Sequence, residues 1–148
     1  MEAGQKFPDF PEHLVWLNVA EQEQDTWISP GCRYYLFYFW SLECPACQMI
    51  CPSLIKRCDD PAKVLSIFIH VPLYEGEKSI ERVKEKAVKM GVAAPIILDH
   101  QYEMASLFGV QGIPSLYLFD QERRLIYAGM GEDGYHTAIQ HIDHATTA

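Results

Sequence analysis

The 148-residue sequence has few basic residues and no long apolar run. Its 12 Lys and Arg are outnumbered by 20 Asp and Glu, which gives a net charge of −8, and no cluster of basic side chains stands out. A surface of this charge repels a phosphate backbone, so we expect no nucleic-acid partner. Because no apolar stretch approaches the ~20 residues that cross a bilayer, we also expect no membrane partner.

A secretory signal is also missing from the first residues, MEAGQKFPDFPEHL, which have neither a basic start nor an apolar stretch. Unless an export signal or an anchor is absent from this sequence, we therefore expect a cytoplasmic protein, in a compartment that keeps thiols reduced. Hydrophobic residues make up 49% of the chain, enough for the core of one domain over residues 1–148. Such a domain needs no disulfide staples, so the five cysteines must serve chemistry or packing.

Apolar runs alternate with amphipathic segments along the chain. The apolar runs predict strands at 13–17, 34–40, 64–71, 95–98, 115–119 and 125–128. Helices are predicted at 45–58, 79–90, 102–108 and 135–145, the second capped by Ser79 and ended by Gly91. Alternation favours a parallel core sheet, to which the final hairpin adds antiparallel edge strands. The predicted class is α/β, a three-layer sandwich with a mixed central sheet and helices on both faces.

Two cysteines stand where a predicted buried strand runs into a helix, in the stretch Cys44-Pro45-Ala46-Cys47. Pro45 is a favoured first residue of a helix. The free N–H groups and the positive end of the helix dipole stabilise a thiolate at Cys44. Cys47 lies one turn deeper and is better shielded. The spacing therefore predicts an exposed attacking thiol and a buried resolving thiol, the pair needed for thiol–disulfide exchange.

Two other interpretations of this pair remain open. The two cysteines could simply be buried, or they could form half of a metal site, because Cys51 and Cys58 follow. Cys51, however, lies one helical turn beyond Cys47 and so on the same predicted buried face. Cys32 and Cys58 are isolated thiols that packing explains. We therefore expect no metal and no cofactor.

The chain resembles the thioredoxin superfamily, and specifically its ResA/TlpA-like branch of thiol–disulfide oxidoreductases. The segment 78–98 looks like the insertion that marks this branch. The resemblance rests further on Phe39-Trp40, the Cys44–Cys47 pair, Pro52 in the next helix, and Val110-Gln111-Gly112-Ile113-Pro114-Ser115, which is similar to the family's cis-proline loop. It implies a thioredoxin-like fold, Cys44 as nucleophile, Cys47 as resolving thiol, and supporting or substrate-binding roles for Ile113, Pro114, Pro45, Trp40 and Glu43.

In the cytosol the expected direction of the reaction is reduction, so the expected partners are a protein disulfide substrate and an upstream thiol reductant. An X-Pro bond reaches the cis form at low cost. With a cis bond before Pro114, the backbone of Ile113 would turn toward the dithiol and offer hydrogen bonds to an extended substrate peptide.

Two positions depart from the family pattern. Glu43 stands just before Cys44, where Trp is common, and its carboxylate should resist any lowering of the Cys44 pKa. Tyr38 stands where many thioredoxins carry a buried acid that helps move the proton of the resolving cysteine. That role then falls to water, to Tyr38 or to Glu43.

Two related activities fit the sequence less well. His70, at the end of the second core strand, together with two cysteines would suggest copper delivery of the Sco type, but that type uses a CxxxC spacing. We interpret His70 as an ordinary strand-end residue. A peroxiredoxin would use Ser41 and Cys44 but needs proline where Phe37 stands.

Overall fold

The computed structural model describes residues 1–19 and 34–146, so Cys32 lies outside the described residues. Its strands are β1 (Val15–Leu17), β2 (Tyr34–Trp40), β3 (Val64–His70), β4 (Ile96–Leu98), β5 (Ser115–Asp120) and β6 (Leu125–Met130). Its helices are α1 (Pro45–Arg57), α2 (Ile80–Met90), α3 (Glu103–Phe108), α4 (Gly131–Thr146) and the short 3-10 helix η2 (Glu75–Lys78). Within these ranges, no helix has the length and apolar character needed to cross a membrane.

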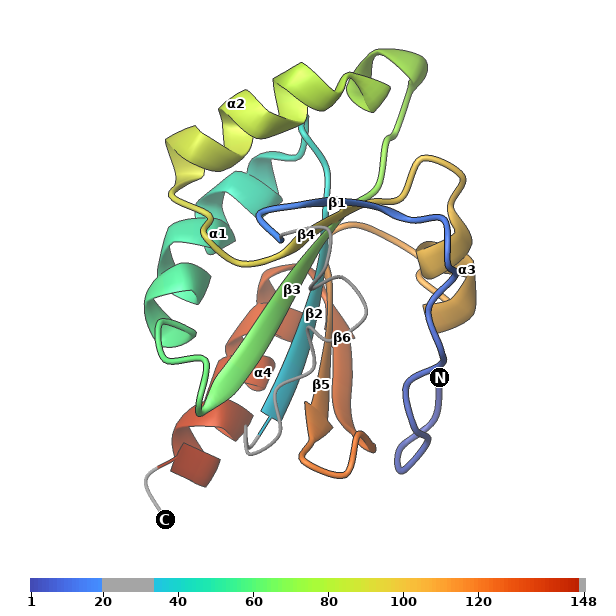
Figure 1. Ribbon diagram of the computed structural model, residues 1–148. Coiled ribbons are helices and arrows are strands. Elements are labelled where there is room, and N and C mark those ends of the chain that lie inside the picture. Colours follow the sequence, from blue (N-terminus) through green and yellow to red (C-terminus); the bar gives the residue numbers. More distant parts are fainter. Residues whose placement is uncertain (20–33, 147–148) are drawn as a thin grey trace.

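The strands form one mixed sheet in the order β1-β4-β3-β2-β5-β6 (Figure 1). Strands β2, β3 and β4 are parallel, and β1, β5 and β6 join antiparallel. The predicted α/β class with a mixed sheet is confirmed. The sequence predicted that both strands of the final hairpin, β5 and β6, lie at the edge of the sheet. Of these two strands only β6 is an edge strand, and β5 lies inside the sheet. Strand β5 is buried along most of its length, which suits an internal position.

Helices cover both faces of the sheet (Figure 1). On one face, α1, α2 and α4 enclose an apolar cluster that contains the side chains of Leu36, Tyr38 and Trp40. On the other face, α3 and the N-terminal segment cover Tyr35, Phe37 and Phe39. Successive residues of β2 thus enter opposite cores, which explains why this strand reads as an unbroken apolar run.

The predicted ends of α2 agree with the structure, whereas the predicted start of α4 does not. Ser79 caps α2 by accepting a hydrogen bond from the Arg82 N–H at 3.3 Å, and Gly91 ends the helix with a φ of 77°. Helix α4, by contrast, begins at Gly131 and not at Tyr135. Gly134 packs so tightly against Gly129 that a side chain would not fit. Close packing therefore keeps a poor helix former inside the first turn.

Candidate active site

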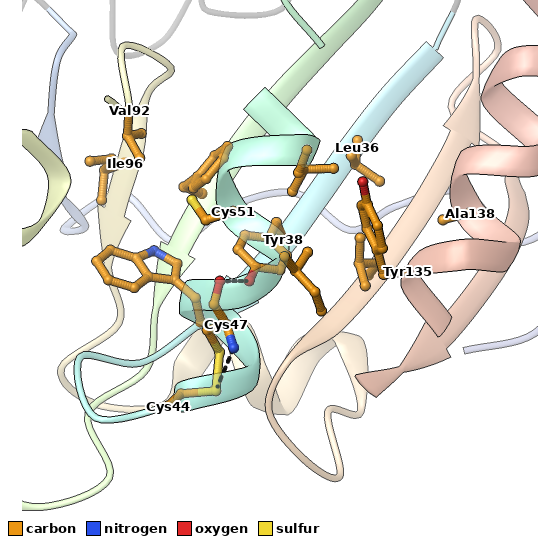
Figure 2. Packing of buried hydrophobic residues seen from close by; sticks show 14 of the residues in the cluster. Leu36, Tyr38, Cys44, Cys47, Cys51, Val92, Ile96, Tyr135 and Ala138 are labelled. Carbon is orange, nitrogen blue, oxygen red and sulfur yellow. Dashed lines mark hydrogen bonds between the residues drawn. A yellow bond between two sulfur atoms is a disulfide. The ribbon is translucent and has the colours of Figure 1, made fainter. Parts of the chain in front are cut away.

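Cys44 and Cys47 form a disulfide at the N-terminus of α1, with 5.2 Å between their Cα atoms (Figure 2). Cys44 is the N-cap, and its sulfur accepts a hydrogen bond from the Cys47 N–H at 3.1 Å. Pro45 occupies the first helical turn, as the sequence predicted. In the reduced protein, the same N–H and the helix dipole would stabilise negative charge on the Cys44 sulfur.

The exposure of the two cysteines differs less than the sequence suggested. In the disulfide form Cys44 is 7% exposed and Cys47 is 1% exposed, so Cys44 is not a freely exposed thiol. Both side chains belong to the apolar cluster under α1, which accounts for the burial of Cys44. The difference keeps the predicted direction, since Cys44 is the more exposed residue of the two.

Trp40 supports the site from inside the core. It is the last residue of β2, is 1% exposed and packs edge-on against the ring of His70 at a centroid distance of 5.0 Å. A side chain this deeply buried cannot contact a substrate. Its place is therefore structural, behind the segment that leads to Cys44.

The loop before β5 and the disulfide lie at the same end of the sheet. Phe39, near the C-terminal end of β2, pairs with Ser115, the first residue of β5. The Ile113–Pro114 peptide bond is cis. Pro114 is buried, and its carbonyl accepts a hydrogen bond from the Gly131 N–H at 2.9 Å. Ile113 is half-buried and packs against both apolar clusters.

An open groove of about 610 Å³ runs beside this loop. It is lined by Val71, by Tyr102, Ala105 and Ser106 at α3, and by residues 109–113 of the loop. Tyr102 on its rim is 42% exposed, so the groove presents apolar and aromatic surface next to the cis-proline loop. A peptide could lie there in an extended form.

Glu43 is exposed, and its charge is matched by a neighbouring cation. Its Oε1 accepts hydrogen bonds from the Tyr74 hydroxyl at 2.7 Å and from an Arg82 guanidinium nitrogen at 3.4 Å. The sequence indicated that Glu43 opposes a thiolate at Cys44. The guanidinium beside it offsets part of that effect, and Arg82 comes from α2, far along the chain.

Glu77 is a site residue that the sequence did not reveal. It is 0% exposed although it lies in the polar run Glu75-Gly76-Glu77-Lys78. Its Oε1 accepts the Leu42 N–H at 2.7 Å, and its Oε2 accepts the Leu73 N–H at 3.2 Å. Nothing in a hydrophilic stretch of this kind predicts burial, so no sequence signal could have found it.

His70 is also fully buried, and it faces Glu77 across 3.4 Å between Nε2 and Oε1. Burial lowers the pKa of His70 from 6.5 to about 4, and the nearby His100 and Arg82 act in the same direction. Among the described residues, neither ring nitrogen of His70 has a hydrogen-bond partner. The imidazole is therefore neutral at pH 7. His70 is the last residue of β3, as predicted, and its ring lies in the core.

Tyr38 lies behind the disulfide, where its hydroxyl donates a hydrogen bond to the Cys47 carbonyl at 3.1 Å (Figure 2). Burial raises the pKa of Tyr38 far above its ordinary value of 10, so the phenol stays protonated. It holds the first turn of α1 and cannot accept the proton of a thiol near neutral pH. Of the three candidates for that task, water and Glu43 remain.

The other described cysteines lie farther along α1. Cys51 is one turn beyond Cys47 on the buried face, as predicted, and burial raises its pKa to about 12 (Figure 2). Cys58 ends the helix, and its pKa is raised to about 12, mainly by burial and to a smaller extent by the nearby charge of Asp59. In the part of the chain that the structure describes, no three His, Cys, Asp or Glu side chains gather into a metal-binding group.

Comparison with known proteins places this geometry among thioredoxin-like proteins. Residues 3–128 match the model of the AhpC/TSA family. The thioredoxin-like protein SkfH of Bacillus subtilis is 38% identical over 142 residues, which cover 96% of this chain and 98% of that protein. Protein DipZ of Mycobacterium tuberculosis is 26% identical over 86% of this chain, which spans 19% of the DipZ length.

Solved structures agree on the fold. A solution structure of a thioredoxin-like protein in the oxidized form superposes with a TM-score of 0.82, at 22% identity, over 96% of this chain and 97% of that one. The structure of MTB dsbF in its mixed oxidized and reduced forms gives a TM-score of 0.64, at 17% identity, over 75% and 79%. The six-stranded sheet with its flanking helices is thus a thioredoxin-like fold.

Proposed function

The chain belongs to the AhpC/TSA family and is a thioredoxin-like thiol–disulfide oxidoreductase, and from this premise we propose that it reduces disulfides in protein substrates. The observation that carries the proposal is the Cys44–Cys47 disulfide at the start of α1, with the Cys47 N–H directed at the Cys44 sulfur. In this proposal Cys44 is the nucleophile and Cys47 the resolving thiol.

The reaction proceeds in two exchanges. The Cys44 thiolate attacks one sulfur of the substrate disulfide, which forms a mixed disulfide and releases the other substrate sulfur as a thiolate. Cys47 then loses its proton and attacks the Cys44 sulfur, which breaks the mixed disulfide and forms the Cys44–Cys47 bond. The substrate leaves with two thiols. An upstream thiol reductant returns the pair to the dithiol form.

The groove beside the cis-proline loop supports binding of an extended substrate peptide. The half-buried Ile113 and the exposed Tyr102 line it, together with residues 109–112 of the loop. Backbone groups of Ile113 would pair with the substrate strand, while Pro114 fixes the turn of the loop. Trp40 contributes only from the core, where it supports the end of β2 that leads to Cys44.

The direction of electron flow depends on the compartment. In the cytosol, where we expect the protein to act, glutathione and thioredoxin systems keep thiols reduced, so the pair would be recharged and would donate electrons. The described part of the chain has two further cysteines outside the disulfide, Cys51 and Cys58. Unpaired thiols are usual in such a compartment.

The test compares two single replacements. Cys47→Ser lacks the resolving thiol, so it should lose turnover of insulin disulfides and accumulate a mixed disulfide through Cys44, visible on a non-reducing gel. Cys44→Ser, the matched control, should lose both turnover and trapping. If Cys44→Ser traps substrate and Cys47→Ser does not, the two roles are reversed. If neither variant traps substrate and the wild-type protein reduces no disulfide, the proposed function is wrong.

A further inference from the structure

Glu77 joins the segment that leads into Cys44 to the segment that follows β3. Its two carboxylate oxygens accept hydrogen bonds from different loops, the Leu42 N–H at 2.7 Å and the Leu73 N–H at 3.2 Å. Leu42 is only two residues before Cys44. Because Glu77 is completely buried, these two bonds take the place of water at its carboxylate oxygens. Glu77 therefore fixes the position of the chain as it enters the catalytic pair.

Among residues 1–19 and 34–146, no buried cation lies beside the negative charge of Glu77. The nearest ring, His70, is neutral at pH 7 because burial lowers its pKa to about 4. Arg82, which lies near His70, is engaged on the surface with Glu43 and the hydroxyl of Tyr74. A second, half-buried ring, His100, also lies close to His70. The two N–H dipoles thus hold the carboxylate without cancelling its charge.

This charge is close enough to act on the Cys44 sulfur. Chain geometry from Leu42 to Cys44 limits the separation from Glu77 to about 15 Å at most. Over such a distance, with an effective dielectric constant of about 20 to 40, a unit charge changes the pKa of a thiol by roughly 0.5 to 1. A negative charge disfavours the thiolate, so the effect on the Cys44 pKa is upward.

We propose that Glu77 is a positioning residue that holds the entry to Cys44 and whose negative charge makes the Cys44–Cys47 pair a better electron donor. Destabilising the thiolate destabilises the reduced form, so the equilibrium shifts toward the disulfide and the pair donates electrons more readily. The inference rests on the proposed function, because it assigns a direction to that reaction. It also gives a role to η2, since Glu77 is the buried residue of this short helix.

The experiment compares Glu77→Gln with Glu75→Gln. Both replacements remove one negative charge from η2, but Glu75 is exposed and pairs with Lys78, so its variant is the matched control. The Cys44 pKa is read from thiolate absorbance near 240 nm, and the redox equilibrium from titration with glutathione. Glu77→Gln should lower the Cys44 pKa by roughly 0.5 to 1. At a pH well above this pKa, where the thiolate is the populated form, it should favour the reduced form about 3- to 10-fold, equivalent to about 15 to 30 mV. Glu75→Gln should match the wild type.

A third variant separates the charge from the structural role. Glu77→Asp keeps the charge but shortens the side chain by one methylene group, so its Cys44 pKa should return close to the wild-type value even if the protein loses stability. If Glu77→Gln and Glu75→Gln give the same pKa and the same redox equilibrium, the inference is overturned. If the wild type forms no reversible disulfide, the proposed function fails, and the inference fails with it.

Should Glu77→Gln not fold, the wild-type protein carries the test. With ¹³C in its carboxyl carbons, the Cδ resonance of Glu77 should change at the pH where Cys44 titrates, because the two charges interact. A Glu77 resonance that stays flat through the Cys44 titration overturns the inference.

Discussion

The buried His70 should make folding stability depend on pH. The folded protein binds a proton at His70 only near pH 4, whereas the unfolded chain does so near 6.5. Between these values the unfolded state binds more protons, so stability falls as the pH falls from 6.5 toward 4 and is fully present above 6.5. The gap corresponds to about 3 kcal/mol at most, of which about 2 kcal/mol is lost between pH 7 and pH 4.5.

Urea unfolding of the oxidised protein at pH 7, 5.5 and 4.5 measures this effect. Other groups also contribute to the pH dependence, and burial raises the pKa of the Asp99 carboxyl in particular. For each protein, the loss of unfolding free energy from pH 7 to pH 4.5 is measured first. The loss in the wild type minus the loss in His70→Leu is then the contribution of His70. We expect His70→Leu to lose about 2 kcal/mol less than the wild type from pH 7 to pH 4.5.

His136→Leu is the matched control, because His136 is exposed in α4. Its loss of stability with falling pH should equal that of the wild type. If the wild type and His70→Leu lose stability in parallel, His70 is not held neutral by burial and the description of this cluster is wrong.

Three further outcomes follow from the contacts around the disulfide. Tyr38→Phe removes the hydrogen bond to the Cys47 carbonyl, so the free energy of unfolding should fall by about 1 kcal/mol while insulin reduction stays within about twofold. A large loss of turnover at unchanged stability would contradict the structural role of Tyr38. Cys51→Ala removes a buried sulfur, so it should lower the free energy of unfolding by about 1 kcal/mol. Mass spectrometry should still show the reversible Cys44–Cys47 disulfide, and its loss would show that Cys51 takes part in the reaction. Arg82→Gln releases Glu43 from its ion pair, so the pKa of the nucleophilic thiol should rise in the 240 nm titration, and a fall would refute the charge assignment.

The sequence alone determined the features that depend on neighbouring residues. The near-continuous apolar runs of β2 and β3 indicated strands buried on both faces, and Ser79 and Gly91 marked the two ends of α2. The Cys44–Cys47 spacing at a strand-to-helix boundary indicated the redox pair. Each of these signals acts over a few residues, through backbone propensity, side-chain periodicity or capping, so it can be read without knowing the fold.

Only the tertiary structure decided the surroundings of the pair. Glu77 reaches the Leu42 N–H across 35 residues of sequence, and Arg82 reaches Glu43 across 39. The low exposure of Cys44 likewise depends on its packing in the apolar cluster under α1. Burial, electrostatic pairing and pKa values depend on which distant segments lie against a residue. A polar run such as Glu75-Gly76-Glu77-Lys78 has the same local pattern in a surface loop as in one that buries a carboxylate, and only packing separates the two.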